Sequence, residues 1–147
     1  MADVAVGHHG KPNKGFLVEL DKSQQNALRL PVHYRFIWND KGSSAHMDLS
    51  IWRPLCPAGY KSLGDVATGS LTETPRPGSI YCVHNKFIST DPQGGWKKIW
   101  RDVGSAVLED VSVYEASTNS DNLQSVNGIG TVAEYKYPMI VPYFLKK

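Results

Sequence analysis

Short runs of apolar residues, each bounded by Gly, Pro, Asn, Asp or Ser, recur along most of the chain. Such runs, when rich in β-branched and aromatic side chains, are typical of β-strands. The 13 glycines and 9 prolines interrupt the chain every few residues, which excludes long helices. Only Glu19 to Leu30 has a helix-forming composition, and its apolar positions do not form one stripe. The pattern predicts an all-β fold of antiparallel strands within residues 16–18, 34–38, 49–52, 79–83, 99–100, 111–114, 130–137 and 139–145.

One segment of the sequence occurs twice with the same internal spacing, over residues 37–52 and 99–114. Each copy has an Ile-Trp pair, then an Asp, then a Gly-Ser pair, and ends in an alternating strand. Asp can cap backbone amides in a turn and Gly tolerates positive φ, so each copy predicts a hairpin. Trp38 and Trp100 are expected at equivalent positions of the two hairpins. With a slip of one residue, 66–68 corresponds to 129–131, which indicates a pseudosymmetric prism, barrel or sandwich.

Composition and charge narrow the class of protein. Residues 1–14 contain almost no large apolar side chain, so we expect a flexible leader before a single all-β binding domain over residues 15–147. The formal net charge of +2 is too small for a dedicated nucleic-acid binder. The chain shows neither an apolar stretch long enough to span a membrane nor a secretion signal. These features predict a cytoplasmic protein, either free or peripherally attached to a membrane. In that compartment Cys56 and Cys82 are expected as free thiols.

Three segments around the first copy form a distinctive motif, namely Ile37 to Ser43, Asp48 to Pro54 and Pro57 to Val66. Together with Tyr81 to His84, they resemble the signature of the vacuolar protein sorting-associated protein 62 family. The resemblance implies a β-prism, in which three antiparallel sheets surround a pseudo-threefold axis. Lectins and membrane-binding domains of pore-forming proteins use the same architecture. Because the sequence holds two clear copies, a third face would come from the strand near Phe16 and the run from Val132 to Leu145.

The residues before the second copy combine an aromatic side chain with basic ones. Gly94 and Gly95 suit a turn, so the side chain of Trp96 is expected near a loop tip. An indole beside ammonium groups suits the headgroup region of an anionic membrane. The alternative is a solvated hairpin whose Trp folds back onto the sheet. Arg53 is a further candidate for a headgroup phosphate or a sugar, unless Trp52 is a core residue followed by a strand-ending proline. The predicted binding residues are Trp96, Lys97, Lys98, Arg101 and Arg53.

Other candidate chemistry has a simpler explanation in local structure. Four aspartates could ligate calcium or a sugar, although Asp in a turn normally accepts hydrogen bonds from nearby amides; they are Asp40, Asp48, Asp102 and Asp110. Cys56 lacks the sequence signature of a nucleophile with an oriented base, so we predict no enzyme, no metal and no cofactor. The leading hypothesis is a module that binds an anionic membrane lipid. The alternative is a glycan-binding, lectin-like or defence-associated protein, and the sequence leaves homo-oligomer formation open.

Overall fold

The computed structural model describes residues 23–103, 109–126 and 128–147. In this part of the chain the structure is almost entirely strand, with one 3₁₀ turn at Asn85–Phe87. Strands of the first half are β1 (Leu28–Arg29), β2 (His33–Asn39), β3 (Ser50–Leu55), β4 (Tyr60–Lys61), β5 (Val66–Thr68) and β6 (Cys82–His84). Strands of the second half are β7 (Ile88–Ser89), β8 (Gly95–Arg101), β9 (Val111–Ser117), β10 (Leu123–Gln124), β11 (Ile129–Ala133) and β12 (Phe144–Lys146).

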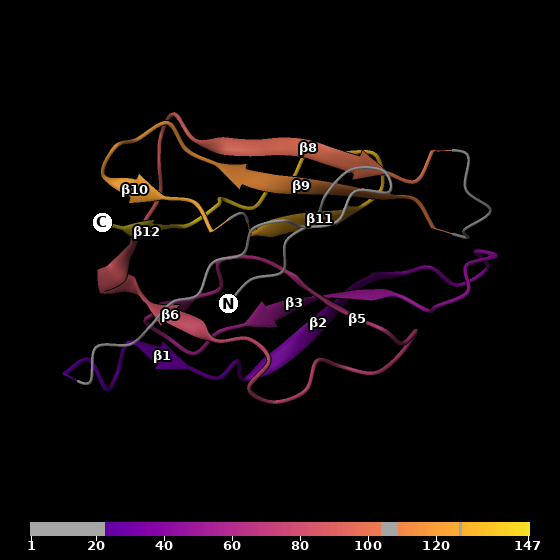
Figure 1. The fold of residues 1–147 in the computed structure, drawn as a ribbon, viewed down its shortest axis with the longest axis horizontal. Coiled ribbons are helices and arrows are strands. Elements are labelled where there is room, and N and C mark those ends of the chain that lie inside the picture. The colour runs from indigo at the N-terminus through magenta and orange to yellow at the C-terminus, as the bar shows by residue number, and fades with distance from the viewer. Residues whose placement is uncertain (1–22, 104–108, 127) are drawn as a thin grey trace.

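The two halves have the same topology, and we call them unit 1 and unit 2. Each unit has a larger sheet, β2-β3-β5 or β8-β9-β11, and a smaller sheet, β1-β6-β4 or β7-β12-β10. Figure 1 shows the larger sheet of unit 2 above that of unit 1, with the smaller sheets toward one end. The predicted all-β, antiparallel and pseudosymmetric fold is confirmed.

The number of sheets differs from the three that a prism implies. The described residues form four three-stranded sheets in two equivalent units, so the internal symmetry relates two copies. The C-terminal strand β12 belongs to the smaller sheet of unit 2, between β7 and β10, and so does not build a third face. Phe16 and the predicted leader lie outside the described residues. The described part of the segment from Glu19 to Leu30 holds a turn and β1.

The hairpins built from the sequence repeat are equivalent, as predicted. Each first strand has a bulge before its tryptophan, and Trp38 then lies opposite Ile51 while Trp100 lies opposite Val113. The turns are also equivalent, because one carboxylate in each accepts a backbone hydrogen bond nine residues on. Asp40 Oδ1 accepts from Leu49 N at 2.9 Å, and Asp102 Oδ1 accepts from Val111 N at 2.9 Å. These two aspartates therefore cap turns, as the simpler interpretation held.

The second part of the repeat is shifted by one residue from the predicted alignment. Ser50 lies opposite Thr68 in unit 1, whereas its counterpart Ser112 lies opposite Val132 in unit 2. Thr68 therefore corresponds to Val132, and the predicted match with Thr131 is wrong. Unit 2 has one more residue before β11 than the predicted alignment of the two units allowed. This shift places Gly130 opposite Tyr114.

Two buried clusters join the units and two others belong to one unit each. Of the joining clusters, one contains Trp38, Ile51, Val111, Val113 and Ile129, and the other contains Leu63, Val83, Ile88 and Val126. Within unit 1, Trp52 packs with Val66 and Ile80, so the core interpretation of Trp52 is confirmed. Because apolar burial is the dominant favourable term in folding, the shared clusters make the two units one cooperative body.

A disulfide links Cys56, just after β3, to Cys82 in β6. The prediction of free thiols is therefore wrong. The two Cα atoms are 5.8 Å apart, a separation that suits a crosslink, and Cys82 is fully buried. The prediction rested on a rule about compartments and had no information on the distance between two residues 26 positions apart. The bond is specific to unit 1, because the counterparts in unit 2 are Thr118 and Phe144.

We expect the disulfide to contribute substantially to stability. Replacing both cysteines by alanine should lower the free energy of unfolding by about 3 to 4 kcal/mol, because the crosslink restricts the unfolded chain. The measurement is urea unfolding of the oxidised protein and of the Cys56→Ala, Cys82→Ala variant. Mass spectrometry after denaturing alkylation without reductant checks the bond itself, and two alkyl adducts on the native protein would contradict it.

Candidate binding surface

The five predicted binding residues lie in two separate places. Trp96, Lys97, Lys98 and Arg101 all belong to β8, which is an edge strand of its sheet. Arg53 lies in the central strand β3 of the other large sheet. The structure therefore brings the four residues of unit 2 together and places Arg53 in a different environment.

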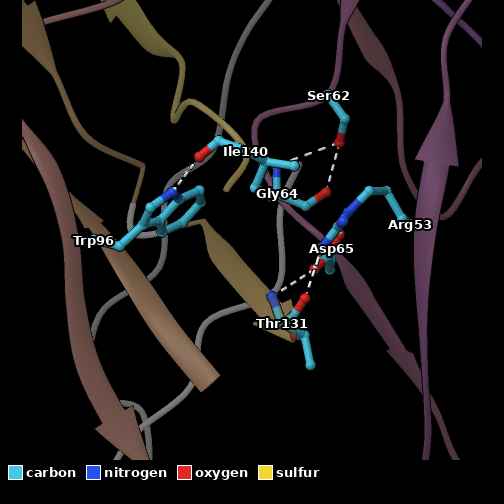
Figure 2. A network of polar contacts seen from close by, with 7 residues as sticks. All are labelled: Arg53, Ser62, Gly64, Asp65, Trp96, Thr131 and Ile140. Carbon is cyan, nitrogen blue, oxygen red and sulfur yellow. Dashed lines mark hydrogen bonds and ion pairs between the residues drawn. The ribbon is translucent and has the colours of Figure 1, made fainter. Parts of the chain in front are cut away.

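Trp96 is a core residue, so its predicted exposure at a loop tip is wrong. The side chain is 9% exposed and packs with Tyr114, Ala116 and Phe144. Its indole Nε1 donates a hydrogen bond of 2.7 Å to the carbonyl oxygen of Ile140, as Figure 2 shows. A Cβ on Gly130 would lie 2.7 Å from indole carbons, so this glycine makes room for the ring. The alternative interpretation, a Trp that folds back onto the sheet, is correct.

The turn before β8 ends ahead of Trp96, so this residue lies in the strand and not at the loop tip. Gly94 N donates to Asp91 O and Gln93 N donates to Asp91 Oδ1, so the turn is complete before the strand begins at Gly95. A hydrogen bond from the Thr118 hydroxyl, with further ones from backbone amides, lowers the pKa of Asp91. A Cβ on Gly94 would lie 2.9 Å from the carbonyl oxygen of Ser117, which shows how closely the turn approaches β9. The two glycines thus serve close packing at the strand start.

Four residues of the edge strand β8 are exposed, and we call them the β8 strip: Lys97, Lys98, Trp100 and Arg101. The register with β9 places Lys98 and Arg101 on one face of the sheet and the other two on the opposite face, so the strip covers both sides of the edge. Within the described parts of the chain, no carboxylate lies within ion-pair distance of these three cations. Trp100 is 39% exposed among them. Trp38 at the equivalent position is buried, because β2 packs against β11 while β8 stays an edge. The equivalence of strand position therefore did not extend to burial.

Tyr135 lies beside Arg101, the last residue of the β8 strip. The Arg101 guanidinium lies 5.5 Å from the centre of the Tyr135 ring, a geometry that suits a cation–π contact. Desolvation raises the pKa of Tyr135 to about 12, with a further contribution from hydrogen bonding to Asp110 and Asp102. The phenol is therefore neutral at any physiological pH, and the positive charge of Arg101 is not cancelled by a phenolate.

Arg53 joins the two units. Its guanidinium donates two hydrogen bonds of 2.8 Å to the carboxylate of Asp65 and one of 2.8 Å to the carbonyl oxygen of Thr131 in unit 2. Thr131 N in turn donates to Asp65 Oδ2 at 2.7 Å. Figure 2 shows this network of one cation, one carboxylate and one strand backbone. The predicted role of Arg53 in binding a ligand stays a prediction, since its described partners are structural.

A small cavity of about 160 Å³ lies between this network and Trp96. The polar groups drawn around it in Figure 2 already bond one another: Ser62 Oγ donates to Gly64 O at 2.5 Å, and Arg53 binds Asp65. The cavity therefore offers a ligand few free polar partners. Among the described residues, no group of His, Cys, Asp or Glu has a geometry that could hold a metal ion. In the part of the chain that the structure describes, no helix is long and apolar enough to cross a membrane.

These features define a class of protein: an all-β module of two equivalent six-strand units, with a cationic edge on one of them. The family model for vacuolar protein sorting-associated protein 62 matches residues 5–135. The chain belongs to this family, and the resemblance seen in its sequence is confirmed.

One solved structure shares the fold. The crystal structure of GNIP1Aa from Chromobacterium piscinae is similar with a TM-score of 0.64 and 23% sequence identity. The similarity covers 82% of this chain and 25% of that chain, so this chain corresponds to about a quarter of the longer protein. No curated protein matches the chain.

Proposed function

We propose that the chain is a non-enzymatic recognition module that binds an anionic membrane surface through the β8 strip. The observation that carries this proposal is the set of three cations on an open strand edge, none of them in an ion pair with a described carboxylate, beside a half-exposed indole. An open edge suits contact with an extended surface, whereas catalysis on a small molecule usually needs an enclosed pocket. The name of the family, which refers to vacuolar protein sorting, agrees with work at a membrane.

The physical chemistry of the β8 strip suits weak, reversible attachment. A basic side chain near an anionic bilayer contributes about 1 kcal/mol, and Trp favours the headgroup boundary. Val103, which is 63% exposed just beyond the strand, adds an apolar residue at the same end of the hairpin. Contacts of this number give an affinity that salt weakens and that a second attachment would strengthen.

Lysines on an edge strand also have a purely structural explanation, because they prevent another strand from pairing with the edge. Glutamine substitutions separate the two explanations, since they remove positive charge while keeping a long polar side chain. A lysine that only protects the edge would be needed for solubility but would have no effect on membrane affinity.

The Lys97→Gln, Lys98→Gln variant should bind acidic liposomes about 30-fold more weakly than the wild type, since each lysine contributes about 1 kcal/mol. Trp100→Ala should weaken binding by a smaller factor. The measurement is co-sedimentation with liposomes of phosphatidylserine and phosphatidylcholine at low and high salt. The matched control is Lys61→Gln, Lys147→Gln, which removes two exposed lysines from outside the β8 strip. Equal binding by the two double variants would exclude the β8 strip as the contact.

A glycan-binding function is the second candidate, and one observation favours it. A groove of about 460 Å³ beside the edge strand β5 is lined by hydroxyl and charged groups, which include Thr68, Ser70, Glu73, Thr74, Arg76 and Ser79. Polar groups that converge on an open groove suit a sugar. Binding of the wild type to an immobilised glycan, together with no binding to acidic liposomes, would favour this function over the first.

The disulfide bears on where the module works. Structural disulfides persist in oxidising compartments and are rare in the cytosol. The bond between Cys56 and Cys82 therefore favours an oxidising compartment over the cytoplasmic location predicted from the sequence. Alkylation of the thiols in protein taken directly from cells distinguishes the two locations.

A further inference from the structure

Another groove, separate from the β8 strip and from the groove beside β5, lies where the two large sheets face each other. It has a volume of about 490 Å³ and is bounded by β2 of unit 1, β11 of unit 2 and the segment 136–140. Both β2 and β11 are edge strands of their sheets and contact each other, so the groove lies along the junction of the two sheets. Its lining includes Arg35, Ile37, Arg53, Val132, Lys136 and Met139.

The charges in this groove are unbalanced. Arg35 lies directly opposite Arg53 on the neighbouring strand, so the two guanidinium groups lie on the same face of the sheet. Like charges in this arrangement are destabilising unless a counter-charge is present. Asp65 supplies that charge to Arg53, whereas Arg35 forms no ion pair with any described residue. Lys136 adds a third cation to the lining, and it forms an exposed ion pair with Glu134.

The remaining lining is apolar. Ile37 and Val132 are half-buried on the two strands. At the rim, Tyr137 is 58% exposed and Met139 is 100% exposed. The position of Tyr137 is nevertheless fixed, because its hydroxyl accepts a hydrogen bond of 2.9 Å from Trp96 N and its ring packs edge-on against Tyr114. The groove thus combines a cationic part with a fixed apolar part.

We infer that this groove holds a single anionic phospholipid, with its phosphate at Arg35 and the start of an acyl chain along Ile37, Val132 and Met139. Charge complementarity selects the anionic headgroup, since Arg35 in the lining forms no ion pair with a described residue, whereas Arg53 and Lys136 are paired with Asp65 and Glu134. The exposed apolar rim selects an amphiphile over a free anion, because an inorganic ion gains nothing from Met139 or Tyr137. This inference rests on the proposed membrane function and names the ligand of a second contact, which converts weak surface attachment into specific binding.

A water-soluble lipid tests the groove without a bilayer. The probe is dihexanoyl phosphatidic acid below its micelle concentration, titrated into isotopically labelled protein and followed by NMR. Wild type should bind the probe, with shifts centred on Ile37, Val132 and Met139. Dihexanoyl phosphatidylcholine should bind at least tenfold more weakly, and inorganic phosphate should also bind at least tenfold more weakly than the probe.

Variants assign the binding to the groove. Arg35→Gln should weaken binding of the probe at least tenfold, and Met139→Gln should weaken it by a smaller factor. Arg29→Gln, at an exposed arginine in β1, is the matched control and should bind like the wild type. Unchanged melting temperatures would show that the substitutions leave the fold intact.

The outcomes separate this inference from the proposed function. No binding of the probe by the wild type, or equal binding by Arg35→Gln, would overturn the groove while leaving the liposome result for Lys97 and Lys98 in place. Equal affinity for inorganic phosphate would also overturn it and indicate an anion site without a lipid tail. If the Lys97→Gln, Lys98→Gln variant keeps both liposome and probe binding, the groove is supported and the β8 strip is not.

Discussion

Replacing Asp65 by alanine should lower the free energy of unfolding by about 3 to 5 kcal/mol, because it leaves a largely buried guanidinium without its counter-charge. Asp65 is 1% exposed and accepts hydrogen bonds from both Arg53 and Thr131 N. The substitution therefore removes the ion pair and also leaves a buried backbone amide of β11 without its acceptor. Since Arg53 and Asp65 belong to unit 1 and Thr131 to unit 2, the loss falls on the junction between units.

Urea unfolding followed by circular dichroism measures this loss, with Asp121→Ala as the matched control at an exposed aspartate. A variant with both Arg53→Met and Asp65→Leu should recover part of the stability, because it replaces the charged pair by apolar groups. A loss below about 1 kcal/mol in Asp65→Ala, the scale of a surface substitution, would show that solvent screens the pair.

Trp38→Ala should cost about 3 to 5 kcal/mol, whereas Trp100→Ala should cost about 1 kcal/mol or less. The two tryptophans occupy equivalent strand positions, but Trp38 is 2% exposed and Trp100 is 39% exposed. Trp38 also donates an indole hydrogen bond of 2.6 Å to the carbonyl oxygen of Glu109, which joins its hairpin to the loop of unit 2. Trp38→Ala therefore loses both a core side chain and a contact between units.

Both variants are unfolded under identical conditions, because the difference between their free energies of unfolding is the quantity of interest. Trp38→Phe should recover part of the loss, since it keeps apolar volume and removes the indole donor. Equal losses of stability for Trp38→Ala and Trp100→Ala would contradict the asymmetric packing of the two units. They would indicate that the indole of Trp100, which the β8 strip needs at the surface, is buried.

The hairpins were predictable because the features that form them are local. An Asp that caps a turn, a Gly with positive φ and an alternating strand lie within a few residues of one another, as at Asp40 and Gly42. The smaller sheets were not predicted, because strands of two or three residues, such as Leu28–Arg29 and Tyr60–Lys61, are too short to show a period. Without those strands the count of sheets and the two-unit architecture could not be derived.

Features that depend on distant contacts were beyond sequence reasoning. The inward direction of Trp96 is set by Ile140 and Gly130, and the disulfide is set by the approach of β6 to the end of β3. The pairing of Arg53 with Asp65 also had no local signal, since an Asp after a Gly usually serves its own turn. The basic part of the β8 strip was predicted correctly as exposed, because three cations in seven residues of a strand can hardly be buried.

The two equivalent units also bear on how the molecule could change over time. A fold that contains the same hairpin twice is redundant, and redundancy relaxes the demands on one of the copies. Unit 1 holds the crosslink, the buried Trp38 and the carboxylate of Asp65, whereas the corresponding edge of unit 2 is open to solvent. Substitutions at the exposed positions of β8 can therefore accumulate at little cost to folding, so a new ligand specificity would arise more easily on unit 2 than on its counterpart.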